Sequence, residues 1–128
     1  MSEMFEKTMI LLFFYIYSVN CLKPQLLKLN EITKVSQNAS IPLTCVPLSG
    51  SKPLKFEWYK NNKQISNFHE LSLNSRVVLT EFESYSVLNL QNILLSDHGE
   101  YSCSVTNSDG SDSTSTILQI QGWFSCLI

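Results

Sequence analysis

The stretch DHGEYSCSV, residues 97–105, contains three side-chain types that together could carry out nucleophilic chemistry. A cysteine thiolate attacks carbonyl groups, and a histidine oriented by a carboxylate accepts its proton. The candidates are Asp97, His98 and Cys103. Alternate residues of a strand face opposite sides, so His98 and Cys103 would not share a face of an extended strand. A cysteine in a disulfide is no nucleophile, so the catalytic interpretation depends on the pairing of Cys103.

Composition limits the classes of protein to consider. The chain has 128 residues, enough for one domain of about 100 residues and a terminal extension. Hydrophobic residues make up 44% and charged residues 16%, which favours a packed core over disorder. The formal net charge is −2 and no basic patch is visible, so nucleic acid is not an expected partner.

Residues 1–21 are predicted to be a secretory signal peptide. Residues 9–19, MILLFFYIYSV, are apolar and uncharged, and this run is too short to span a bilayer as a helix. Val19 and Cys21 are small enough to precede a cleavage site after Cys21, with Ser18 as the second choice. A buried N-terminal strand or an uncleaved anchor remains the alternative.

The four cysteines predict a disulfide rather than a metal site. They are Cys21, Cys45, Cys103 and Cys126, with no C-x-x-C pair and no histidine at ligand-like spacing. We therefore expect no metal and no cofactor. Cys21 leaves with the signal peptide and Cys126 belongs to a C-terminal tail. Cys45 and Cys103, 58 residues apart, remain as the natural pair in an oxidising compartment.

From Asn38 onward, polar and apolar residues alternate in short runs bounded by Gly, Pro, Asn and Ser. Such runs are typical of half-buried antiparallel strands, and several together predict an all-β sandwich or small barrel. The runs cover residues 39–47, 54–60, 85–93, 100–107 and 114–121, with shorter strands at KQIS and RVVLT. The alternation places inward Ile41, Leu43, Cys45, Phe56, Trp58, Leu88, Leu90, Ile93, Tyr101, Cys103, Val105, Thr116, Leu118 and Ile120.

The order of Cys45, Trp58, Tyr101 and Cys103 resembles that of an immunoglobulin domain. Trp58 follows Cys45 by 13 residues, and Tyr101 stands two residues before Cys103. The resemblance covers about residues 23–122 and implies a two-sheet sandwich in which the Cys45–Cys103 bridge joins the sheets and Trp58 packs against it. We expect a signal peptide at 1–21, this domain at 22–122 and a tail at 123–128.

The same resemblance gives DHGEYSCSV a structural role. It implies that the Tyr101 hydroxyl bonds to backbone near Asp97, that Gly99 permits the close approach, and that Asp97 pairs with Arg76. The term core lock is used below for these residues and the bridge: Cys45, Trp58, Arg76, Asp97, Gly99, Tyr101 and Cys103. This interpretation replaces the catalytic one, so we expect no enzyme.

The spacing after Trp58 and the hairpin at residues 107–110 resemble the I-set type of immunoglobulin domain. Residues 23–32, 42–65 and 86–120 look like a domain of the arthropod Dscam family, including its chelicerate relatives. That resemblance implies an extracellular cell-adhesion domain whose partner is an identical or related receptor. A soluble, secreted immune-recognition or ligand-binding domain is the alternative. An intracellular structural I-set domain is disfavoured by the signal-like segment and the cysteine pair.

Two further expectations concern attachment and modification. The final residues, GWFSCLI, do not continue into a second domain, so we expect a truncated product or a sequence read past an exon boundary, with a functional secreted isoform as the alternative. Membrane attachment is expected only through parts absent from this chain. Asn38-Ala39-Ser40 is the sole N-x-S/T sequon and predicts a glycan on the turn before residue 41, unless the sequon is unused.

Strand parity predicts a protein-binding face. If Cys45, Leu88 and Leu90 point inward, their sequence neighbours point outward and form a largely apolar stripe on one sheet. The opposite sheet would show mostly polar side chains. Isolated surface valines that need no partner are the alternative. The predicted face consists of Thr44, Val46, Val78, Tyr85, Val87 and Asn89.

Overall fold

The computed structural model describes residues 22–66 and 76–122. The predicted signal peptide at 1–21 and tail at 123–128 lie outside these residues. The strands are β1 (Gln25–Leu26), β2 (Ile32–Ser36), β3 (Ile41–Cys45), β4 (Pro47–Ser49), β5 (Lys55–Lys60), β6 (Lys63–Ile65), β7 (Val77–Glu81), β8 (Ser86–Leu90), β9 (Gly99–Asn107) and β10 (Gly110–Gln121). One 3-10 turn, Leu95–Asp97, lies before β9.

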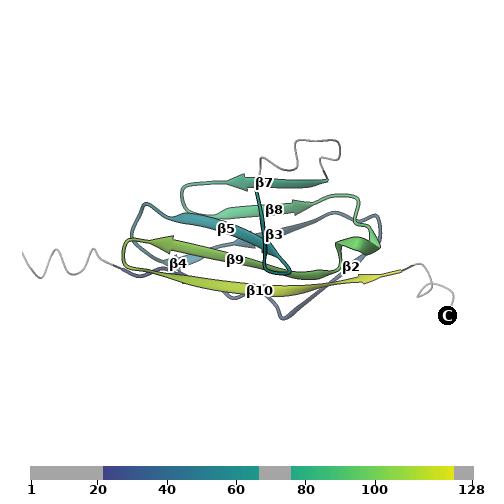
Figure 1. The fold of residues 1–128 in the computed structure, drawn as a ribbon, viewed down its shortest axis with the longest axis horizontal. Helices are drawn as coiled ribbons and strands as arrows, with labels where there is room; N and C mark the ends of the chain where they lie inside the picture. The colour runs from purple at the N-terminus through teal and green to yellow at the C-terminus, as the bar shows by residue number, and fades with distance from the viewer. Residues whose placement is uncertain (1–21, 67–75, 123–128) are drawn as a thin grey trace, which may run out of the picture.

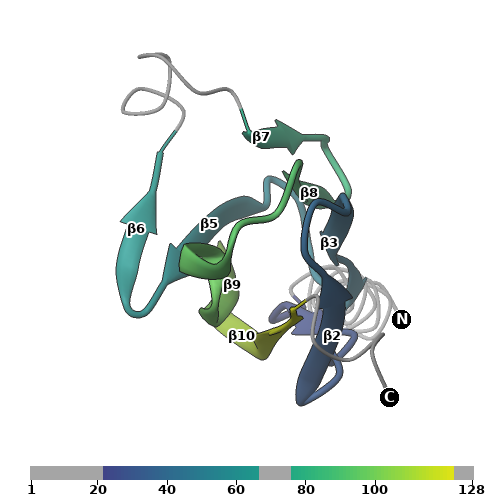
Figure 2. The same cartoon turned by 90° about the vertical axis from the view of Figure 1, so that its right-hand side faces the viewer.

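The strands form a two-layered sandwich. One layer is a five-stranded sheet in the order β2-β10-β9-β5-β6, and the other is a three-stranded sheet in the order β3-β8-β7. β1 and β4 form a short separate pair. Figure 1 shows the strands running along the length of the molecule, and Figure 2 looks along them, with β5, β9 and β10 in one layer and β7, β8 and β3 in the other. The all-β, two-sheet prediction is confirmed.

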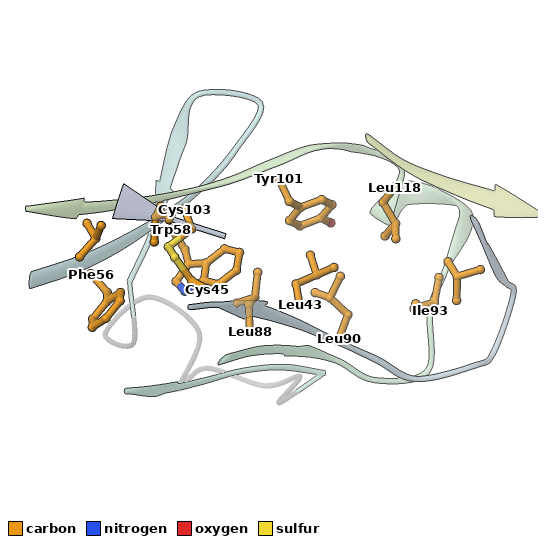
Figure 3. Close-up of a cluster of buried hydrophobic side chains, with 13 residues drawn as sticks. Leu43, Cys45, Phe56, Trp58, Leu88, Leu90, Ile93, Tyr101, Cys103 and Leu118 are labelled. Atoms are coloured by element: carbon orange, nitrogen blue, oxygen red, sulfur yellow. A yellow bond between two sulfur atoms is a disulfide. The ribbon is translucent and has the colours of Figure 1, made fainter. Parts of the chain in front are cut away.

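The core lies between the two layers and follows the alternation of the sequence. In β8 every second residue is buried, and in β9 the burial alternates over Gly99–Val105. Cross-strand register places Leu43 and Leu79 on either side of Leu88. Each residue expected to point inward is buried or packs against the buried cluster, and Thr116 is the one polar residue among them. Figure 3 shows most of this cluster between the sheets.

Two N-terminal strands were missing from the sequence prediction, which began its strands at Asn38. β2 carries three β-branched residues, Ile32, Thr33 and Val35, and pairs in parallel with the last part of β10. Thr33 and Thr116 share a hydroxyl–hydroxyl hydrogen bond of 2.7 Å across this pair. β1 is two residues long and pairs with β4 outside the two layers, whereas β2 joins the five-stranded layer.

Candidate protein-binding face

The disulfide of the core lock is present as predicted. Cys45 on β3 and Cys103 on β9 are bonded, with their Cα atoms 6.2 Å apart, and both are fully buried. The bond therefore ties the three-stranded sheet to the five-stranded one. Closing a loop of 58 residues should stabilise the domain by about 4 kcal/mol in the chain-entropy model.

Trp58 lies next to this bridge on β5 (Figure 3). Its register partner on β9 is Cys103, and its side chain is fully buried. The indole Nε1 donates a 2.9 Å hydrogen bond to the hydroxyl of Ser86, which is also fully buried. Sequence reasoning did not identify Ser86 as this partner, although its parity with Leu88 and Leu90 could have placed it inward.

Tyr101 and Gly99 connect β9 to the turn before it. The Tyr101 hydroxyl donates a buried 2.7 Å hydrogen bond to the backbone oxygen of Asp97. Gly99 has a φ of +156°, and a Cβ at this position would lie 2.9 Å from the amide of Asn61. Asn61 in turn accepts a 2.9 Å hydrogen bond from the backbone N–H of Glu100. Gly99 thus leaves room for Asn61 to hold the start of β9.

Asp97 and Arg76 form an ion pair at the edge of the core. The closest nitrogen–oxygen distance is 2.8 Å, and Asp97 also accepts a 2.7 Å hydrogen bond from the backbone N–H of Leu94. Burial alone would raise the pKa of Asp97. The hydrogen bonds from Arg76 and Leu94 outweigh that effect, so its pKa lies below the ordinary value. Asp97 is therefore held as a carboxylate at neutral pH.

The three candidates for nucleophilic chemistry do not form a catalytic group. The sulfur of Cys103 is bonded to Cys45, and the carboxylate of Asp97 is bonded to Arg76. The Nδ1 atom of His98 lies 2.9 Å from the backbone oxygen of Leu118. Each group is thus engaged elsewhere. Among the described residues, no three His, Cys, Asp or Glu side chains are arranged to hold a metal ion.

The predicted face residues gather on the outer side of the β3-β8-β7 sheet. The register aligns Thr44, Val87 and Thr80 in one row across the three strands. A second row contains Asn89 and Val78. Val78 is 37% exposed, and Thr44, Val87 and Asn89 are half-buried. Because the side chains of these rows are uncharged, another apolar surface could cover them without burying a charge.

The apolar surface extends beyond the predicted residues. Val46 follows Cys45 at the end of β3, and Tyr85 precedes Ser86, the register partner of Cys45, at the start of β8. The Tyr85 ring stacks on Phe82, with ring centroids 4.5 Å apart. On the other side of Val46, its backbone oxygen accepts a 2.9 Å hydrogen bond from the N–H of Leu27. We call the combined surface the apolar face: Leu27, Val46, Leu48, Val78, Phe82, Tyr85 and Val87.

Leu27, Leu48 and Phe82 were missed by sequence reasoning. Leu27 is 54% exposed and Leu48 is 63% exposed, and both lie in the segments that β1 and β4 bring together. Leu48 continues the parity of Thr44 and Val46, so that signal was available. The position of Leu27 on this face depends on the pairing of β1 with β4, which the sequence pattern did not reveal.

The outer side of the five-stranded sheet has a different chemistry. Ser102 and Ser104 on β9 lie between β5 and β10, opposite Ser115 and Ser113. At the β5 edge, Glu57 accepts hydrogen bonds from Tyr59 at 2.6 Å and from Lys55 at 2.7 Å. The Lys55 bond is the largest influence on Glu57 and lowers its pKa, with the Tyr59 bond acting in the same direction. The β9 and β5 part of this surface is polar, whereas at the β10–β2 pair Ile117 and Ile32 lie side by side and are 45% and 50% exposed.

The sequon residue Asn38 lies on the turn between β2 and β3. It is exposed, has a φ of +67°, and its backbone N–H donates to the oxygen of Ile93 at 2.8 Å. The turn is thus held by backbone while the side chain stays accessible. Within residues 22–66 and 76–122, no helix combines the length and apolar character of a bilayer-spanning segment.

Comparison with known proteins identifies the family of the domain. The family model for the immunoglobulin I-set domain matches residues 24–120. Among curated proteins, neural cell adhesion molecule 1 from Gallus gallus is 32% identical over 99 residues, covering 77% of this chain and 9% of that protein. Pro-neuregulin-1, membrane-bound isoform, from Gallus gallus is 31% identical over 97 residues, covering 76% of this chain and 16% of that protein. The chain thus spans a small part of these relatives.

Solved structures show the same architecture. The I-band fragment I67–I69 of titin superposes with a TM-score of 0.66 at 30% identity, covering 78% of this chain and 33% of that chain. The Dscam1 Ig7 domain, isoform 5, superposes with a TM-score of 0.67 at 21% identity, covering 77% and 97%. At this identity, the likeness to the Dscam1 domain shows a shared fold. Together with the disulfide, the buried tryptophan and the sheet order, these matches show that the chain belongs to the immunoglobulin I-set domain family.

Proposed function

We propose that this chain is an extracellular recognition domain of the cell-adhesion type that binds a second copy of itself through the apolar face. The observation that carries the proposal is the group of exposed or half-buried apolar residues Val46, Tyr85, Phe82, Leu27 and Leu48 at one end of a sheet whose central rows have uncharged side chains. Exposed apolar patches of this kind mark protein-binding surfaces. An uncharged face also meets its own copy without repulsion between like charges.

The extracellular location has its own support. A buried disulfide persists in oxidising compartments, and the curated relatives include a protein named as a cell adhesion molecule. A partner that is a related rather than an identical immunoglobulin-domain receptor would use the same surface. The proposed role is binding without catalysis, and it requires no cofactor.

A glycan at Asn38 is part of the proposal. The Asn38 turn precedes the start of β3, whereas Val46 follows its end, so about 17 Å of strand separates them. A glycan there would leave the Val46 end of the apolar face open. Protein from a eukaryotic secretory host should carry one glycan at Asn38, seen as a mass shift that a glycosidase removes. An unchanged mass after treatment would remove this part of the proposal.

The test of self-recognition uses the domain placed in a multidomain receptor on beads. Val46→Lys and Val87→Lys put a charge in the apolar face and should weaken bead aggregation, because the charge would have to be buried in the contact. Ser104→Lys is the matched control on the other sheet and should aggregate like the parent. Loss of aggregation with Ser104→Lys, and none with the valine variants, would place the interface on the five-stranded sheet.

A further inference from the structure

The N-terminal residues 22–31, which we call the strap, are attached to the domain by several short and separate contacts. Their backbone pairing is short: Gln25 and Leu26 pair with β4, and Leu27 donates to the oxygen of Val46. Pro24 and Leu26 are nonetheless almost completely buried. At the start of the strap, the backbone oxygen of Leu22 accepts hydrogen bonds from the N–H of Ser51 at 3.0 Å and from the side chain of Asn107 at 2.7 Å. The strap is therefore held by two buried apolar side chains and by separate hydrogen bonds rather than by a long strand pairing.

Side chains of β10 fasten the strap on its other side. Asp112 accepts a 2.8 Å hydrogen bond from the backbone N–H of Leu26, and Thr114 accepts one of 2.9 Å from that of Leu29. Lys28 reaches back to Asp112 at 3.2 Å and to the backbone oxygen of Ser113 at 2.9 Å. The strap and β10 are thus joined by these side-chain hydrogen bonds and by one backbone bond, in which the N–H of Ile117 donates to the oxygen of Glu31 at 2.9 Å.

This arrangement leaves part of β10 without a second strand partner. β2 pairs with β10 only from Ile117 onward, and among the described strands residues 111–116 pair with β9 alone. The strap lies along that open edge, and near its start Lys23 lies over Gly110, where a Cβ would come within 2.9 Å of its side chain. An edge with free backbone groups is a template for pairing with another chain, and the strap covers it.

We propose that the strap is a detachable segment, fastened by Asp112 and Thr114, and that a second copy of this chain takes it up when it is released. The second copy is the fitting partner because it offers the same pockets for Pro24 and Leu26 and the same acceptors on β10. Exchange of an identical segment re-forms each of these contacts between two molecules, at little cost. The strap thus controls a route to dimers that differs from contact between two apolar faces, although the strap carries Leu27 of that face.

The test combines Asp112→Ala with Thr114→Val, which remove both side-chain acceptors. Val87→Lys is included in every protein, so association through the apolar face does not contribute. Hydrogen exchange at the amides of Leu26, Leu27 and Leu29 should accelerate by about tenfold or more, because Leu26 loses a bond to a charged group. The exchanged dimer lacks the same two acceptors, so the variant should reach its dimer faster than the parent rather than hold more of it, and sedimentation at successive times after concentration measures this rate. Glu83→Ala, which breaks the exposed Lys52–Glu83 pair, is the matched control and should form dimer at the rate of the parent.

A cross-link then distinguishes exchange from other association. Leu27→Cys with Val46→Cys places a cysteine on the strap and one on the strand beside it. In an exchanged dimer, oxidation joins two chains, and a non-reducing gel shows a covalent dimer; in the closed monomer it joins one chain to itself. Should the double variant fail to fold, Thr114→Val alone carries the test with the same readouts. Unchanged exchange rates, or dimers without the interchain cross-link, would overturn the proposal.

Discussion

Strand β8 contributes to both the core lock, which is buried and stabilises the fold, and the apolar face, which is accessible to a partner. Its inward residues, Ser86, Leu88 and Leu90, are buried against the core lock, and Ser86 accepts the indole N–H of Trp58. Its outward residue Val87 belongs to the apolar face and touches solvent. The inward side chains are packed on all sides, so a substitution there changes the core and lowers stability. The outward side chains face solvent, so a substitution there can change binding without loss of the fold.

This comparison predicts that substitutions in the core lock lower stability, whereas those in the apolar face lower association. Trp58→Ala should have the largest effect, a loss of about 3–5 kcal/mol, because it opens a cavity next to the disulfide and leaves the Ser86 hydroxyl without its donor. Urea unfolding followed by circular dichroism measures the loss. A change below about 1 kcal/mol would show that Trp58 does not support the core.

Removal of the disulfide should destabilise the domain about as much as Trp58→Ala. Cys45→Ala with Cys103→Ala should lower the free energy of unfolding by about 4 kcal/mol, since the unfolded chain regains the freedom of a 58-residue loop. The same urea titration reports it. Peptide mapping of the parent under non-reducing conditions should recover the two cysteines as one cross-linked species; a free thiol at either position in folded protein would contradict the assignment.

The Arg76–Asp97 pair should make stability depend on pH. The folded-state pKa of Asp97 lies below its ordinary value of 3.8, so its stabilising contribution is full above that value and is lost as the pH falls toward the lower, folded pKa. Asp112, whose pKa is also lowered, foremost by the hydrogen bond from Leu26, acts in the same direction. Asp97→Asn should flatten the acid limb of a plot of unfolding free energy against pH. An acid limb as steep as that of the parent would assign the dependence to other groups.

Arg76→Ala tests the contribution of the Arg76–Asp97 ion pair to stability at neutral pH. It leaves the largely buried Asp97 carboxylate without its cation, and because Arg76 itself is partly exposed we expect a loss of about 1–3 kcal/mol. Lys52→Ala, at a solvent-exposed pair, is the control and should change stability by less than about 0.5 kcal/mol. Equal losses for the two variants would show that burial of Asp97 plays no part.

The smallest change in stability is expected on the apolar face. Val78 is 37% exposed, so Val78→Lys should alter the free energy of unfolding by no more than about 0.5 kcal/mol. The same variant should reduce self-association, because Val78 pairs with Asn89 on the outer side of the sheet and the added charge would have to be buried in the contact. A large loss of stability would show that Val78 supports the core and that its side chain is not free for a partner.

The core of this domain was predictable because its strands alternate with period two. Cys45, Trp58, Tyr101 and Cys103 are placed inward by that alternation alone, and the cysteine count together with the family resemblance indicates that Cys45 pairs with Cys103. The parity argument also located Val87 and Val46. The sequence could not reveal β1, since two residues are too few to show a period, nor its pairing with β4 across more than twenty residues. Leu27 and the strap therefore emerged only from the structure.

Amide hydrogen exchange of the parent domain at low and high protein concentration tests the central claim most directly. If the apolar face is the site of self-recognition, protection should rise with concentration at Val46, Val78 and Val87, and stay constant at Ser102 and Ser104 on the other sheet. Concentration-dependent protection confined to Ser102 and Ser104, or none on either sheet, would contradict the account.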